Sequence, residues 1–359
     1  MTERPTSAAL GLLALLLAIP DASAAQQPAD SGAFVVRLGA DTVSVERWVR
    51  RGDRIEATAV TRSPRTAVRR LVLTLAPDGS VARFAAGPAA QTPAPEERPP
   101  AVAGAIPLVG GFWLPWELVF MRARGAGRDS VVVDVLTGGA ARPTPVVKTG
   151  DNRFRSVSQF DQDMNARVDA RGRLLALDVV LGNSVERVSW IDTDALARDF
   201  AARDQAGRGL GPLSPRDTII RSVRGARVVV DYGRPSLRGR PLDVLVPPGQ
   251  VWRAGANDAS TLTTDRPLAF QGYTLAPGTY SVFVLPEPGR WTLIINRQTG
   301  ISGLDRHPAQ DLARIPMQTR TNAPVTERFT IDVTEGGSGG VLTFRWGALE
   351  AGARFSVGG

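Results

Sequence analysis

The residues with the clearest capacity for chemistry gather in the last two fifths of the chain. They are Tyr232, Arg234, Trp252, Arg253, Asn257, Asp258, Tyr280, Trp291 and Asn296. An arginine fork binds a carboxylate or phosphate, and a tryptophan ring stacks on a sugar or another ring. The cluster therefore predicts a site for a small polar ligand. A structural interpretation stays open: the tryptophans fill a core, and Arg234 and Arg253 pair with Asp231 or Asp258.

A second candidate site is apolar. Phe112, Trp113 and Trp116 lie in the most apolar stretch of the N-terminal half, residues 112–120. Such a stretch predicts either a patch for an apolar ligand or ordinary core packing.

Metal and cofactor chemistry finds little support in the composition. The chain has no cysteine and one histidine, His307, in a loop sequence. Zinc, haem and iron–sulfur sites need several such ligands. Residues 161–165 (DQDMN) resemble the start of a calcium loop, but Ala166 and Gly172 stand where that loop needs Gly and Glu. We therefore predict no metal, no cofactor and no catalytic residue; a hydrolase using Asp231 and Asp258 has no motif behind it.

Short β-branched and aromatic runs alternate with Pro and Gly around these residues. Residues 244–246, 261–263, 279–285 and 291–295 are strand candidates, and the segments between them are turn sequences. Both faces of residues 280–285 are largely apolar, which indicates burial on both sides. This rhythm predicts an antiparallel β-sandwich over residues 216–359.

The same region resembles a known family, the DUF2911 family of exported bacterial proteins. The resemblance rests on five stretches in order and covers about residues 213–357. They are Leu213–Thr218 (LSPRDT), Tyr232–Arg240 (YGRPSLRGR), Val246–Asn257 (VPPGQVWRAGAN), Leu275–Phe283 (LAPGTYSVF) and Trp291–Asn296 (WTLIIN). The resemblance implies the fold of this region and an exported protein. It implies no catalytic residue, because the family is a domain of unknown function.

The N-terminal half predicts a second all-β domain over residues 32–206. Hairpin turns separate its strands, and one helix is expected at 194–204, capped by Asp192 or Thr193. Residues 87–107 are a Pro/Ala-rich loop, and the glycines and prolines of 207–215 form a linker. We expect a twisted antiparallel sheet with one helix, which resembles the open half-barrels of periplasmic lipoprotein carriers at the level of fold alone.

The N-terminus predicts export. Arg4, the apolar run 8–19 and the small residues 22–24 fit a signal peptide at residues 1–24. The run is shorter than the roughly 20 residues of a membrane span, so we expect no transmembrane segment in the mature chain. The net charge of +8 comes almost wholly from arginine and is evenly spread, so no nucleic-acid partner is expected.

These observations favour a periplasmic or extracellular binding protein rather than an enzyme. The first hypothesis is a non-catalytic module that binds a small polar ligand, a saccharide or a protein at the C-terminal domain. The second is a carrier of lipophilic ligands built on the N-terminal sheet, and the third is a hydrolase of unknown substrate.

Overall fold

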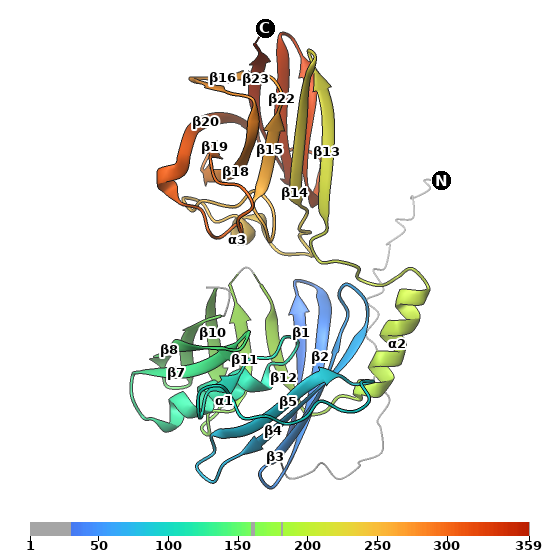
Figure 1. Ribbon diagram of the computed structural model, residues 1–359, viewed down its shortest axis with the longest axis vertical. Coiled ribbons are helices and arrows are strands. Elements are labelled where there is room, and N and C mark those ends of the chain that lie inside the picture. Colours follow the sequence, from blue (N-terminus) through green and yellow to red (C-terminus); the bar gives the residue numbers. More distant parts are fainter. Residues whose placement is uncertain (1–29, 159–161, 181, 359) are drawn as a thin grey trace, which may run out of the picture.

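The computed structural model describes residues 30–158, 162–180 and 182–358 (Figure 1). Each half of the chain forms one large, strongly curved sheet, and almost every strand pairing is antiparallel. The predicted all-β fold class is therefore confirmed. The predicted signal peptide, residues 1–24, and Asp161 of the calcium-like sequence lie outside the described residues.

The N-terminal sheet contains twelve strands. They are β1 (Ser31–Leu38), β2 (Asp41–Arg51), β3 (Arg54–Thr61), β4 (Ala67–Leu75), β5 (Val81–Pro88), β6 (Ile106–Pro107), β7 (Ser130–Thr137), β8 (Ala140–Gly150), β9 (Arg153–Val157), β10 (Asp163–Val168), β11 (Leu174–Val179) and β12 (Ser184–Val188). Their order is β5-β4-β3-β2-β1-β12-β11-β10-β9-β8-β7-β6. Two meanders thus meet where β1 pairs with β12, and the chain crosses between them through β6 and helix α1 (Leu114–Gly125).

The two faces of this sheet pack against different helices. Alternate residues of β3 (Ile55, Ala57 and Ala59) face the concave side and the core around α1. Val60 faces the convex side, where it packs with Phe200 of helix α2 (Thr193–Gln205). Figure 1 shows the sheet curving around α1, with α2 on the outside. Because side chains alternate between the two faces of a strand, β3 contributes to two separate apolar clusters.

Helix α2 forms where the sequence predicts it. The Asp192 carboxylate accepts hydrogen bonds from the N–H groups of Asp194 (3.0 Å) and Ala195 (2.9 Å), so the cap is Asp192.

Helix α1 was not predicted. Its segment has no clear helical periodicity, because the curved sheet surrounds the helix and buries most of its circumference.

The segment between β5 and β6 contains the predicted Pro/Ala-rich loop. It runs back along β5, where Phe84 and Arg98 exchange two backbone hydrogen bonds of 2.8 and 2.9 Å. The Thr74 hydroxyl donates to Glu97 of this segment (2.7 Å). These bonds hold the segment against the outer strands of the first meander.

The C-terminal domain contains eleven strands. They are β13 (Arg216–Val223), β14 (Ala226–Gly233), β15 (Ser260–Thr264), β16 (Leu268–Phe270), β17 (Tyr273–Leu275), β18 (Gly278–Glu287), β19 (Arg290–Asn296), β20 (Asp311–Arg320), β21 (Thr326–Gly336), β22 (Gly339–Gly347) and β23 (Leu349–Val357), with the short helices α3 (Leu242–Leu245) and η1 (Pro308–Gln310). The sheet folds back on itself through the β20–β23 pairing and encloses one core. Strand β18 is buried on both faces, as predicted: Val282 and Val284 face this core, and Phe283 packs with Ala259 and Ile294 on the other side.

No helix within the described residues is long and apolar enough to cross a membrane.

Candidate functional site

A partly open cavity lies on the concave face of the N-terminal sheet, beside the first turn of α1. Its volume is about 370 Å³. We call it the α1 cavity. Its described lining residues are Val43, Ser44, Thr61, Ser63, Leu108, Val109, Gly110, Gly111, Phe112, Trp113, Trp116, Ser158, Gln162, Met164, Val179, Gly182, Asn183 and Leu213. The volume falls within the range of roughly 300–1,000 Å³ that is usual for small-molecule pockets.

The described lining residues are mostly apolar, and none of them is charged. Phe112, Trp113 and Trp116, the predicted apolar candidates, all contribute to the lining, and Met164 of β10 contributes as well. Among the residues that the structure describes, every polar lining group is a hydroxyl, an amide or a backbone group. A charged ligand group would lose its hydration here without gaining an ion pair, so the lining favours a neutral ligand.

The buried carboxyl group of Glu46 fixes the segment that carries the tryptophans of the cavity wall. Glu46 of β2 is completely buried, and it accepts hydrogen bonds from the N–H groups of Trp113 (2.6 Å) and Leu114 (3.2 Å). The Trp113 side chain makes no capping bond of its own. Glu46 therefore caps α1 from a neighbouring strand and fixes the turn that carries both tryptophans.

Burial also changes the proton affinity of Glu46. Loss of hydration raises the pKa of this carboxyl from 4.5 to about 8, and the two N–H bonds and the Arg187 charge oppose that rise. Glu117 lies close enough to raise it further.

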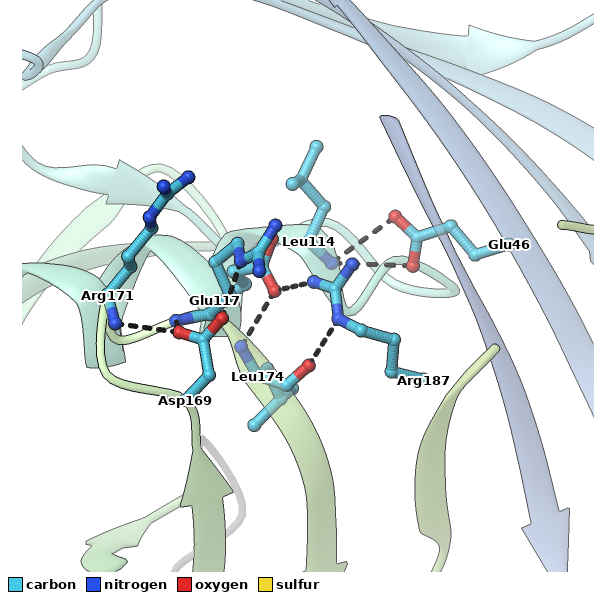
Figure 2. A network of polar contacts seen from close by, with 8 residues as sticks. Glu46, Leu114, Glu117, Asp169, Arg171, Leu174 and Arg187 are labelled. Atoms are coloured by element: carbon cyan, nitrogen blue, oxygen red, sulfur yellow. Dashed lines mark hydrogen bonds and ion pairs between the residues drawn. The ribbon is translucent and has the colours of Figure 1, made fainter. Parts of the chain in front are cut away.

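The second buried carboxyl belongs to α1 itself. Glu117 pairs with the Arg187 guanidinium of β12 and accepts the N–H of Leu174 (2.8 Å). Burial raises the pKa of Glu117, and the Arg187 charge opposes the rise. Figure 2 shows the Arg187 guanidinium reaching both the Glu117 carboxyl and the Leu174 carbonyl, with Glu46 facing the start of the helix at Leu114. The pair ties α1 to the middle of the sheet.

Aromatic rings complete the surroundings of Arg187. Its guanidinium lies over the rings of Phe34 (5.0 Å) and Trp48 (5.8 Å). Cation–π contacts of this kind compensate part of the desolvation of a buried cation.

Sequence analysis did not single out Glu46, Glu117 or Arg187. One signal was available: Glu117 is the sole charged residue in the apolar stretch 112–120. Glu46 and Arg187 carry no such signal, because alternating charged residues in a strand are typical of a solvated face.

The residues predicted to form a polar site lie in the C-terminal domain in two groups. Tyr232, Arg234 and Trp252 surround Phe329, with Tyr232 and Trp252 in edge-to-face contact with its ring. Trp252 also stacks on Trp346 at 5.5 Å. These side chains build the core, in line with the structural interpretation that the sequence left open.

The polar groups of this first set are satisfied within the protein. Arg234 pairs with Asp217 (2.9 Å) rather than with Asp231 or Asp258, and it also donates to Thr330 (3.0 Å). The Tyr232 hydroxyl donates to the carbonyl of Ile331 (3.2 Å).

The predicted site residues of β18 and β19 also pack or hydrogen-bond within the protein. Trp291 is buried in the core. The Asn296 amide donates to the His307 carbonyl (3.1 Å) and to Asp311 (2.9 Å). Tyr280 is half-buried, and its hydroxyl donates to Ala276 (3.1 Å).

The second group is the loop that carries Arg253, Asn257 and Asp258. Asn257 has a φ of 63°, and its carbonyl accepts the N–H of Gly303 (2.9 Å). The Arg253 chain lies directly against Gly303, where an added Cβ would approach the Arg253 Cδ to 2.5 Å. Within the described parts of the chain, no hydrogen bond or ion pair joins the Arg253 guanidinium to another group, and burial lowers its pKa.

The two aspartates of the hydrolase hypothesis have separate roles. Asp231 pairs with Arg216 and accepts the Thr218 hydroxyl (2.6 Å). Asp258 is exposed, and its backbone bridges to Ser302.

Fold and site together describe an all-β protein with two large antiparallel sheets, the first of which contains a mostly apolar cavity. Residues 214–355 match the model of a family described as "Protein of unknown function (DUF2911)". This match confirms the resemblance to the DUF2911 family seen in the sequence. The description of the family assigns no activity, and no curated protein matches the chain.

The raised pKa of Glu46 predicts a pH-dependent stability. The folded protein keeps this proton up to about pH 8, whereas the unfolded chain releases it near 4.5. The folded state binds more protons between these values, so the free energy of unfolding falls as the pH rises through them. Between these pH values the free energy of unfolding of the wild type should fall by roughly 3–5 kcal/mol more than that of Glu46→Gln, which cannot titrate.

Urea denaturation between pH 4.5 and 8.5 measures both free energies. An equal pH dependence of the free energy of unfolding in wild type and variant would contradict the raised pKa of Glu46.

The Arg187–Glu117 pair predicts a large cost when only one partner is removed. Arg187→Met leaves a buried carboxyl without its cation and should lower the free energy of unfolding by about 3–5 kcal/mol. Arg203→Met, which breaks the exposed pair with Asp199, is the matched control and should cost less than about 1 kcal/mol. Equal losses in the two variants would show that the buried pair does not hold α1.

Proposed function

We propose that this protein binds a small, uncharged, largely apolar molecule in the α1 cavity and acts as its carrier. The observation that carries the proposal is the aromatic cavity wall in the concave face of the sheet. Three aromatic side chains, Phe112, Trp113 and Trp116, line one cavity with no charged group among its described residues. Apolar pockets with a few placed polar groups are the usual form of a small-molecule site.

The location of the polar groups supports an amphipathic ligand. The polar lining residues come from strands and turns of the sheet rather than from α1; they are Ser44, Thr61, Ser63, Ser158, Gln162 and Asn183. A ligand with an apolar body and an uncharged polar end would place its body against the tryptophans and hydrogen-bond through the other end.

The export that the sequence predicts agrees with the role of a carrier. The pattern of residues 1–24 predicts a signal peptide, which would deliver the protein to the periplasm or the exterior. A binding protein in a compartment of this kind can hold an apolar molecule that water dissolves poorly. The polar-ligand hypothesis requires stacking by Trp252, whose ring already stacks on Trp346 in the core, so the apolar site is favoured over it.

The cavity proposal is tested with N-phenyl-1-naphthylamine, a neutral apolar fluorophore. Thr61→Trp fills the cavity from β3 and should weaken binding at least tenfold, about 1.4 kcal/mol, because the bulky ring occupies the ligand volume. Val132→Trp, at an exposed position of β7 outside the cavity, is the control and should bind like wild type. Fluorescence titration gives both affinities. Binding that Thr61→Trp leaves unchanged would place the site elsewhere.

A second candidate function rests on Arg253, a half-buried residue whose guanidinium has no ion-pair partner among the described residues. It would bind the carboxylate or phosphate of a polar ligand at the C-terminal domain. Native mass spectrometry of protein purified from its own host should then show an anionic adduct that Arg253→Gln loses while its melting temperature stays within a few degrees. An adduct retained by Arg253→Gln, or a variant that unfolds, would assign Arg253 to the fold.

A further inference from the structure

The segment between the two domains supplies part of the α1 cavity wall. Leu210 and Leu213 belong to the segment between α2 and β13, yet both pack against the N-terminal core. Leu213 lines the cavity itself. The cavity is therefore incomplete without a residue that precedes the C-terminal domain by only a few positions.

This segment is fixed at both of its ends. At the α2 end, the Asp204 carboxylate accepts the N–H of Thr66 (2.6 Å) on the N-terminal domain. At the other end, the carbonyl of Pro215 accepts the N–H of Arg234 (2.8 Å) in the C-terminal domain. Leu213 lies two residues before this second anchor, so its position depends on where the C-terminal domain sits.

A second contact joins the domains beside the same cavity. The N–H of Ala40, in the turn between β1 and β2, donates to the carbonyl of Arg238 (2.8 Å), and Asp41 pairs with the Arg238 side chain. Gly39 allows this approach, because a Cβ there would lie 2.0 Å from the Arg238 carbonyl oxygen. Figure 1 shows the β1–β2 end of the sheet directed toward the C-terminal domain.

The turn leads directly into the cavity wall. Strand β2 continues from Asp41 to Val43 and Ser44, which both line the α1 cavity. Both connections between the domains thus end at this cavity. The second one is small: 38% of the Asp41 side chain is accessible, and 10% of the Arg238 side chain. Relative motion is the usual behaviour of two domains joined by a small polar interface.

We propose that the DUF2911 domain controls access to the α1 cavity. While Arg238 holds the β1–β2 turn, Leu213 stays in the cavity wall and keeps the cavity partly closed. When that contact breaks, the linker moves away with the domain and the cavity opens further. This inference rests on the proposed function, because it assigns the regulation of the same site. Opening by domain separation is a common way to gate a ligand cavity.

A reversible cross-link between the domains tests the mechanism. A Cβ placed on Gly239 lies 3.8 Å from the Cβ of Ala40, within the range of about 3.5–4.5 Å found in disulfides. The chain has no cysteine of its own. The double variant Ala40→Cys/Gly239→Cys can therefore be locked by oxidation and released by reduction. Since Gly239 has a φ of 75°, its substitution strains both forms equally, and the two are compared within one protein.

The measurement is stopped-flow fluorescence with N-phenyl-1-naphthylamine on the full chain. Oxidation should slow association and dissociation of the probe at least tenfold relative to the reduced form. Leu213→Ala and Arg238→Ala should each speed exchange in an otherwise unchanged chain. Arg221→Ala, which breaks an exposed pair with Asp332 inside the C-terminal domain, is the control and should exchange the probe like wild type.

The outcomes separate this inference from the proposed function. Probe binding with equal rates in the oxidised and reduced forms, or unchanged exchange in both Leu213→Ala and Arg238→Ala, would overturn the gating role and leave the cavity site standing. If no form binds the probe, the proposed function and the gating role both fail. Should the double cysteine variant not fold, the two alanine variants decide the question alone.

Discussion

The N-terminal domain depends on the hydrogen bonds and the ion pair that satisfy buried polar groups inside its curved sheet. These groups are the first N–H groups of α1 and the Glu117 carboxyl. Helix α1 enters the concave face with its first N–H groups unpaired by its own cap, and Glu46 supplies the missing acceptor. Glu117 then needs a cation, which Arg187 provides from β12. Removing one member of such a network leaves a desolvated polar group, which costs more than a typical hydrogen bond contributes. The network therefore fixes the helix in a single position.

That position is what creates the cavity. With α1 held at its first turn, Trp113 and Trp116 form one wall and the strands behind them form the other. Leu213 adds a side chain from the linker, so part of the cavity wall comes from the segment that joins the two halves of the chain. In the C-terminal domain, in contrast, aromatic residues pack in the core, where Trp252, Phe329 and Trp346 are in mutual ring contact. Arg253, which has no ion-pair partner among the described residues, lies in a loop outside this aromatic cluster.

The sequence predicted the periodic and local features well. The alternation of strand and turn sequences predicted both sheets. The family-like motifs of residues 213–357 agree with the family match at residues 214–355. Helix α2 is readable because it lies on the surface with a capping Asp192. Helix α1 is not, because burial on nearly every side removes the amphipathic pattern that prediction relies on. The Trp252 cluster was expected as one site; in three dimensions it divides between a core and a loop.

The sequence by itself determined the composition of the sites: which segments are apolar, where turns occur, and that no cysteine and a single histidine are available. Only the tertiary structure decided which charged residues are buried and which distant segments meet. Glu46, Glu117 and Arg187 lie far apart along the chain and look like ordinary strand or helix charges, yet the closing of β1 against β12 brings them together. Period and propensity describe neighbours in sequence, whereas desolvation and ion pairing depend on the path of the whole sheet.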